Sequence, residues 1–109
     1  MVFSVQQIKY ELLGYIKEFD QRFENWFVGI AEDPKKTLAE IHGLDLDTDR
    51  WIYKQALSFT AARTVQRYFL ERLKTDGVAI TEGDDNLDCV YAYQKNRHTK
   101  PGVSEDANE

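Results

Sequence analysis

A short apolar segment with a helix start close behind it constrains this chain more than any other feature. Residues 26–30, Trp-Phe-Val-Gly-Ile, predict a strand, because the segment is short and rich in aromatic and β-branched residues. Asp33 can accept hydrogen bonds from free amides at a helix N-terminus, and Pro34 fits the first helical position. Gly43 supplies a helix stop. We therefore expect a strand, a short loop and a helix over residues 26–42.

The other elements follow from caps, apolar spacing and turn residues. Ser4 and Gln7 have the spacing of a capping box, and helical periodicity continues to about residue 24. Gly14 lies inside this helix at a cost of about 1 kcal/mol relative to alanine, which suggests a close packing partner. The later elements are a strand over residues 51–56, a helix from Ser58 or Thr60 to about Lys74, and a strand over residues 88–95. The expected fold is one small α+β domain in α-β-α-β-α-β order, with a three-stranded, mainly antiparallel sheet packed by helices.

Composition predicts where the folded domain ends and which kind of partner the charge favours. The 109 residues suit a single domain, and 42% apolar residues are ample for its core. Residues 96–109 contain only Val103 and Ala107 as apolar residues, so we expect a globular domain over residues 1–95 followed by a disordered polar tail. The formal charge of -5 weakens the case for nonspecific binding to nucleic acid without excluding a local basic face.

The cysteine count and the hydropathy pattern predict a cellular setting. Cys89 is the only cysteine, so an intrachain disulfide is impossible and a reducing compartment is the simplest context. No export signal and no long apolar run is visible in the sequence. These features predict a cytoplasmic protein without membrane contact.

The strand and helix over residues 26–42 resemble the second half of the GIY-YIG endonuclease signature, and the likeness extends over about residues 26–73. In that family a strand ending in Tyr-Ile-Gly or Tyr-Val-Gly leads to a helix with an arginine followed by leucine. A later helix carries a metal-binding glutamate. Thr37 stands here at the arginine position and Gln66 at the glutamate position, while Leu38 keeps the leucine. The resemblance implies a GIY-YIG-like fold with a substituted active site.

Two more positions match that site, and one element of the family is missing. His42 lies one residue beyond the family's usual histidine, and Tyr53 lies in the following strand. No Gly-Ile-Tyr strand precedes Phe27, where a long helix is expected instead. The late strand around Tyr91 offers a replacement for it in a rearranged sheet.

The two substitutions weigh against catalysis. Phosphodiester cleavage needs a cation to offset charge on the phosphoryl oxygens and a base to activate water. Thr37 carries no charge, and the neutral amide of Gln66 is a weak ligand for magnesium. No residue is therefore assigned a catalytic role and no cofactor is expected. A divergent nuclease that uses magnesium or manganese stays open as the alternative.

Charged residues give two further hypotheses about partners. Nucleic acid would meet a set of cations, which are Lys35, Lys36, Arg63 and Arg67. The plainer interpretation is a solvated face on which Arg67 pairs with Glu71. A basic protein would instead meet the acidic loops, in which case the chain would be an interaction or inhibitor module. Those loops contain Asp45, Asp47, Asp49, Glu82, Asp84, Asp85 and Asp88, and ordinary solvation also explains them.

Isolated reactive side chains have structural explanations as well. His42 is suited to act as a general base beside a tyrosine, but its place at a helix C-terminus also explains it. Cys89 shows no catalytic spacing with a histidine, so we expect a small buried side chain. The sequence thus predicts a non-catalytic, degenerate GIY-YIG-like domain that binds nucleic acid or a nucleic-acid-processing protein, and phage or mobile-element origin is compatible with it. The aromatic-rich first helix can pack on the sheet or form a homodimer.

Overall fold

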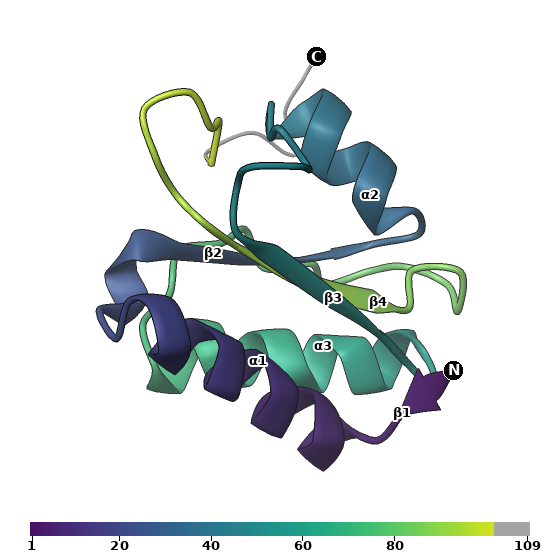
Figure 1. Cartoon of the computed structure of the whole chain (residues 1–109). Helices are drawn as coiled ribbons and strands as arrows, with labels where there is room; N and C mark the ends of the chain where they lie inside the picture. Colours follow the sequence, from purple (N-terminus) through teal and green to yellow (C-terminus); the bar gives the residue numbers. More distant parts are fainter. Residues whose placement is uncertain (102–109) are drawn as a thin grey trace.

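A four-stranded mixed sheet organises the molecule, in the order β1-β3-β4-β2 (Figure 1). This computed structural model describes residues 1–101. The central strand β4 (Cys89–Gln94) pairs antiparallel with β2 (Trp26–Ala31) on one side and with β3 (Trp51–Ala56) on the other. The three predicted strands are therefore confirmed. The short strand β1 (Val2–Phe3), parallel to β3, was not predicted, because two residues carry no periodicity to recognise.

Three helices complete the α+β fold, and their caps follow the sequence. Helix α1 (Val5–Phe19) begins with the predicted capping box, in which Gln7 and Ser4 bond each other's main-chain amides. Helix α1 stops before the predicted residue 24 because Asp20 turns to extended backbone. The remaining helical segments are a turn, Phe23–Asn25; α2 (Pro34–Lys36), continued by a π-helical turn, Thr37–Ile41; and α3 (Phe59–Arg67), continued by a π-helical turn, Tyr68–Arg72.

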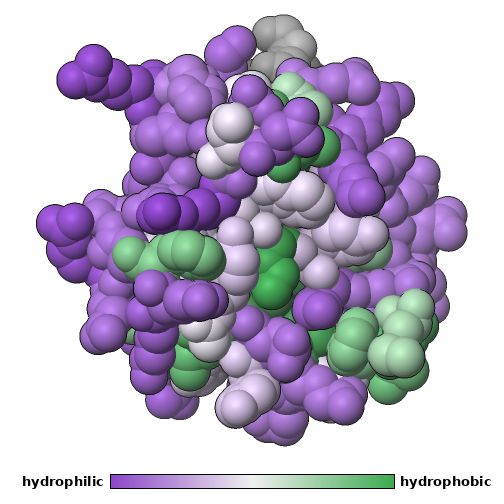
Figure 2. Space-filling view, in the orientation of Figure 1, coloured by the Kyte–Doolittle hydropathy of each residue, from purple (hydrophilic) through white to green (hydrophobic). Residues whose placement is uncertain are grey.

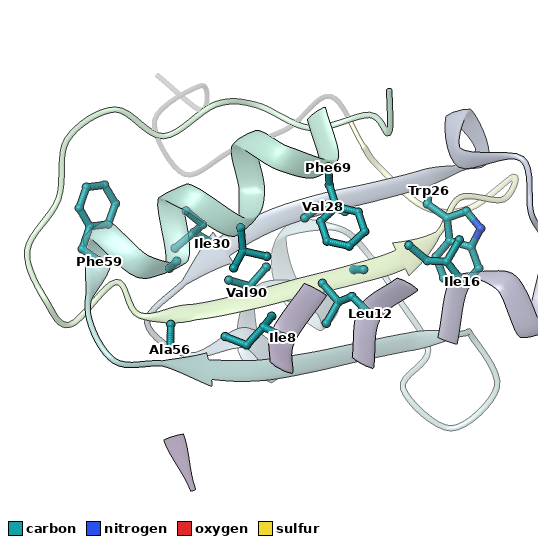
Figure 3. Close-up of a cluster of buried hydrophobic side chains, with 13 residues drawn as sticks. Ile8, Leu12, Ile16, Trp26, Val28, Ile30, Ala56, Phe59, Phe69 and Val90 are labelled. Carbon is teal, nitrogen blue, oxygen red and sulfur yellow. The ribbon is translucent and has the colours of Figure 1, made fainter. Parts of the chain in front are cut away.

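The two faces of the sheet are covered unequally. Helices α1 and α3 lie on one face, and the short α2 lies on the other (Figure 1). Strand residues alternate between the faces, so Val28 and Val90 enter the core under α1 and α3. Figure 3 shows this core, with Leu12 of α1 and Phe69 of the turn after α3 directed toward the strands. The second core, beneath α2, is smaller and contains Phe27, Ala31, Leu38, Leu44, Tyr91 and Tyr93.

Within residues 1–101 Gly14 has no packing partner, which corrects the expectation of a close contact. A Cβ atom built at Gly14 finds nothing within 4 Å. The residue is exposed in the middle of α1, so the packing of the described residues gives no reason for a glycine there.

None of the helices in residues 1–101 is long and apolar enough to cross a membrane.

Gln66 fastens the outer edge of β2. The segment after the last helical turn runs beside β2, where the Val28 amide donates to the Asp76 carbonyl at 2.9 Å. The fully buried Gln66 donates through Nε2 to the carbonyls of Val28 and Val78, at 3.2 and 3.0 Å. Its Oε1 accepts from the amide of Ile80 at 3.2 Å. This side chain therefore replaces strand pairing where the segment leaves β2.

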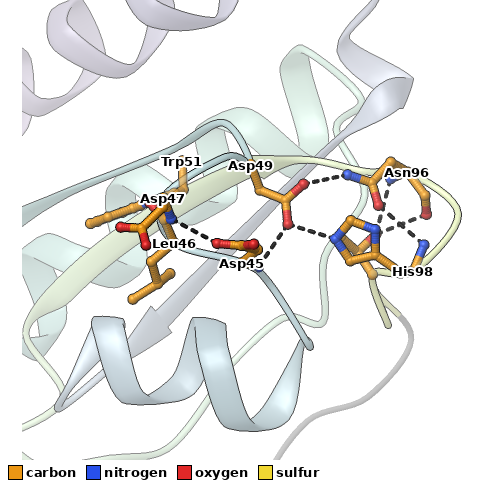
Figure 4. Close-up of polar contacts among 8 residues, drawn as sticks. Asp45, Leu46, Asp47, Asp49, Trp51, Asn96 and His98 are labelled. Atoms are coloured by element: carbon orange, nitrogen blue, oxygen red, sulfur yellow. Dashed lines mark hydrogen bonds and ion pairs between the residues drawn. The ribbon is translucent and has the colours of Figure 1, made fainter.

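The first part of the predicted tail belongs to the folded body. Asn96 and His98 both bond the carboxylate of Asp49, at 2.7 and 2.6 Å (Figure 4). The amide of Lys100 donates to the carbonyl of His42 at 2.9 Å. Polar partners, rather than apolar burial, hold this segment beyond the predicted boundary at residue 95. The remainder of the predicted tail lies outside the described residues.

Replacing Gln66 by glutamate is expected to destabilise the fold. The change removes two donors from the carbonyls of Val28 and Val78 and buries a carboxylate, so Gln66→Glu should cost at least about 3 kcal/mol at neutral pH. Burial raises the pKa of such a carboxyl group, so the folded state holds its proton longer and the deficit should grow from pH 5 to pH 8. Urea unfolding at both pH values measures this. The same change at exposed Gln6 is the control, and an equal effect of both substitutions would contradict the structural role.

Candidate functional site

The positions matched to the GIY-YIG site do not converge. Thr37, His42 and Tyr53 lie on the side of the sheet that α2 covers, with Thr37 and His42 buried. Gln66 lies on the other side, fully buried between α3 and the main chain beside β2. The sheet itself separates Thr37 from Gln66, so the two side chains cannot act on one phosphate.

His42 anchors the smaller core. Its Nε2 lies 2.7 Å from the hydroxyl of Tyr91, and its Nδ1 lies 3.0 Å from the hydroxyl of Tyr93 and 2.9 Å from the carbonyl of Lys100. A carbonyl only accepts, so Nδ1 carries the proton and Nε2 accepts from Tyr91. The ring of Phe27 packs 4.7 Å from the imidazole, measured between centroids. His42 is thus a satisfied core residue rather than a general base open to solvent, and buried hydrogen bonds rather than the helix dipole account for it.

Burial also fixes the protonation of this cluster. It lowers the pKa of His42, although the carbonyl of Lys100 favours the charged form. It raises the pKa of Tyr93 far above the ordinary value, and the neighbouring Tyr91 and Asp76 act in the same direction. His42 and Tyr93 are therefore neutral over the physiological range.

A glycine across the strand makes room for this cluster. Gly29 of β2 lies directly opposite Tyr91 of β4. A Cβ atom at Gly29 would lie 2.4 Å from the phenol oxygen of Tyr91, closer than real contacts allow. The space at Gly29 is thus occupied by the side chain of Tyr91, which crosses the glycine to reach His42.

The four candidate nucleic-acid-binding residues are divided between two faces. Lys35 and Lys36 belong to α2, while Arg63 and Arg67 belong to α3 behind the sheet. Arg67 pairs with Glu71 at 3.2 Å, as the interpretation of a solvated face predicted. These residues therefore provide two small separate patches of positive charge.

The acidic loop before β3 uses its carboxylates internally. Asp45 accepts from the amide of Asp47, and Asp49 accepts from the amide of Asp45 (Figure 4). Burial alone would raise the pKa of Asp49, but hydrogen bonds from His98, Asp45 and Asn96 together lower it. Asp45 and Asp49 therefore act as local turn and docking residues.

An open groove remains where α2 fails to cover the sheet. It has a volume of about 780 Å³ and runs from β1 across β3 and β4 to the turn between β2 and α2. We call it the acidic groove and define it by Glu32, Asp33, Tyr53, Gln55, Asp88 and Cys89. A smaller groove of about 310 Å³ shares Glu32 and Asp33 with it and is also lined by Thr37 and Glu40. Two of the matched positions, Tyr53 and Thr37, therefore lie at adjoining surfaces.

The acidic groove is electronegative. In residues 1–101, Glu32, Asp33 and Asp88 form no ion pair within 4 Å. Lys54 lines the groove, but its ammonium group lies 3.9 Å from Glu11 of α1. Lys54 and the N-terminal ammonium of Met1 also line the groove, so its three carboxylates exceed its cations by one, and this excess favours a positively charged ligand.

The pKa of Cys89, which lines the acidic groove, reflects the same negative charges. Burial raises the pKa of its thiol to about 11, with further contributions from Asp88 and Asp33. Asp88 also accepts from the amide of Gln55 at 2.8 Å. The thiol is therefore neutral at physiological pH, which agrees with the expectation of a buried, unreactive cysteine.

The sequence pattern did not predict this groove. Glu32 and Asp33 follow β2, and Asp88 precedes β4, so they lie close only because Ala31 pairs with Cys89. Strand pairing would have supplied the signal. No three His, Cys, Asp or Glu side chains in the described part of the chain are placed to share a metal ion. No family model, curated protein or solved structure matches the chain.

Acidification should weaken the fold through His42. Because the folded pKa lies below the unfolded value, the unfolded chain binds the proton first as pH falls, and the free energy of unfolding decreases. Between pH 7.5 and 5.5 we expect a loss of roughly 1 kcal/mol, measured by urea unfolding. His98→Gln is the control and should keep this slope. A slope that disappears in His98→Gln would assign the effect to the exposed histidine instead.

Proposed function

We propose that this chain is a non-catalytic domain that binds a macromolecule, and that the acidic groove receives a basic segment of a protein partner. The observation that carries the proposal is a set of three carboxylates, Glu32, Asp33 and Asp88, that line one open surface without ion pairs in the described residues. Lysine or arginine side chains of a partner would pair with these carboxylates. A cytoplasmic setting, inferred from the single cysteine, belongs to the same proposal.

The arrangement of the candidate residues favours a protein partner over nucleic acid. Phosphates would meet the carboxylates of the groove, while the four proposed cations are split between α2 and α3. Descent from a GIY-YIG module stays a hypothesis that rests on the sequence pattern around Thr37 and Gln66. The separation of these two residues argues against cleavage at a site that they share.

Charge-neutral variants test the proposal without changing the shape of the groove. The variant Glu32→Gln, Asp33→Asn, Asp88→Asn removes three charges, and asparagine at position 33 still caps α2. The probe is a capped heptapeptide of alternating lysine and valine, titrated by fluorescence anisotropy. At about 0.2–1 kcal/mol per exposed pair, we expect affinity to fall about tenfold.

A matched variant separates the groove from net charge. Glu24→Gln, Asp47→Asn, Glu82→Gln removes three exposed carboxylates that line none of these grooves, and it should keep the natural affinity. Equal losses in both variants would contradict a specific site. Salt-dependent binding of DNA or RNA that disappears when Lys35, Lys36, Arg63 and Arg67 become alanine would favour a nucleic-acid partner instead.

A further inference from the structure

The outer edge of β3 presents main-chain groups away from the sheet. The Gln94 amide donates to the Arg50 carbonyl, and the Ala56 amide donates to the Asp88 carbonyl, so even-numbered residues of this strand turn their main chain toward β4. Trp51, Tyr53 and Gln55 consequently turn theirs outward. This edge faces the same side of the molecule as α1 and the N-terminus (Figure 1).

Only part of that edge is covered. Strand β1 pairs beside Gln55 and Ala56. The phenol of Tyr15 interacts with the main chain of Trp51. This interaction lowers the pKa of Tyr15, but burial raises it by a larger amount. Within residues 1–101, the amide and carbonyl of Tyr53 have no hydrogen-bond partner. One strand residue is thus free to pair with an incoming backbone.

A groove follows this edge along α1. It has a volume of about 450 Å³ and is lined by Ile52 of β3 and by Leu13 and Gly14 of α1. Figure 2, viewed toward β3, shows a central strip of white and green residues bordered by hydrophilic purple residues. The half-buried residues of β3 here are Trp51, Ile52 and Tyr53.

The position of Gly14 in the wall of this groove explains why a glycine is suited to it. No packing contact among the described residues offsets the cost of a glycine in this helix, because none of their atoms lies within 4 Å of the place where a Cβ would stand. A glycine in a groove wall lets another chain come close to the helix. The groove therefore combines an unpaired strand edge, apolar side chains and an open helix surface.

We propose that an extended basic segment of a partner protein adds to the sheet as a strand beside Tyr53, in line with β1. This inference rests on the proposed function and specifies how the partner binds. Side chains of an added strand alternate between the two faces of the sheet. One set would meet Ile52 and Leu13 in the groove along α1, and the other would point toward the acidic groove.

Charge selects this occupant over a second copy of the chain. Glu32, Asp33 and Asp88 line the acidic groove and exceed its cations, Lys54 and the N-terminal ammonium of Met1, so the face that this groove borders favours a cationic segment. In the groove along α1, Lys17 offsets one of the two carboxylates, Glu11 and Glu18, so this face suits the apolar side chains of the segment. Antiparallel pairing of two copies about Ile52 would set Arg50 of one copy opposite Lys54 of the other. Like charges in facing positions are unfavourable.

N-methylated peptides test the strand geometry. Nuclear magnetic resonance of the labelled full chain would follow the lysine–valine heptapeptide and two versions methylated on the amides of either the valines or the lysines. Only alternate amides of an added strand face β3, so one version should bind as the parent does and the other should lose at least about tenfold in affinity. Hydrogen exchange of the Tyr53 amide should slow when the parent peptide binds.

A pair of variants at Gly14 tests the groove. Gly14→Ala adds little bulk and should raise stability while keeping affinity, whereas Gly14→Met also suits a helix but fills the groove and should weaken binding at least about fivefold. Unfolding curves of both variants confirm that each is folded.

The failures of the two proposals are distinguishable. Equal binding of both methylated peptides, with shifts confined to the acidic groove, would overturn strand addition and leave the proposed function standing. Absence of binding by the parent peptide would overturn both. Shifts at Tyr53 that depend on protein concentration alone would identify a second copy as the occupant and overturn the inference.

Discussion

The double burial of β4 is the constraint on which the rest of the structure depends. This strand is paired on both edges, and its residues Cys89 through Tyr93 are buried. Val90 and Ala92 need only apolar cover from α1 and α3, but Tyr91 and Tyr93 bring hydroxyl groups into the opposite face. A buried hydroxyl needs a partner, and His42 satisfies both. The imidazole thereby links the turn after α2 to Lys100.

This arrangement leaves part of the sheet uncovered. The helix that delivers His42 is short, so it covers the sheet over Tyr91 and Tyr93 but not over the ends of β3 and β4. The acidic groove is a consequence of this limited cover, and the uncovered edge at Tyr53 results from the shortness of β1. The proposed binding surfaces therefore lie where the sheet is incompletely covered, whereas the positions matched to a nuclease site are divided by the sheet.

Most helices and strands could be predicted from neighbouring residues, whereas the segments that depend on long-range pairing could not. The capping box at Ser4, the helix start at Asp33 and the bounds of β3 follow from neighbouring residues, and all three are confirmed. Strand β1 and residues 96–100 depend on partners far along the chain. Gln66 matched a catalytic position by spacing, but spacing does not tell which face of the sheet a helix covers. Resemblance to GIY-YIG domains remains a prediction.

Native-state hydrogen exchange of β3 tests the central claim most directly, because it reports which main-chain groups of the free protein are paired. The account predicts alternation, in which the amides of Ile52 and Lys54, bonded toward β4, exchange at least about a hundredfold more slowly than the amide of Tyr53. Uniform protection of all three amides would contradict it, since the outer edge of β3 would then be covered already and no strand could be added there.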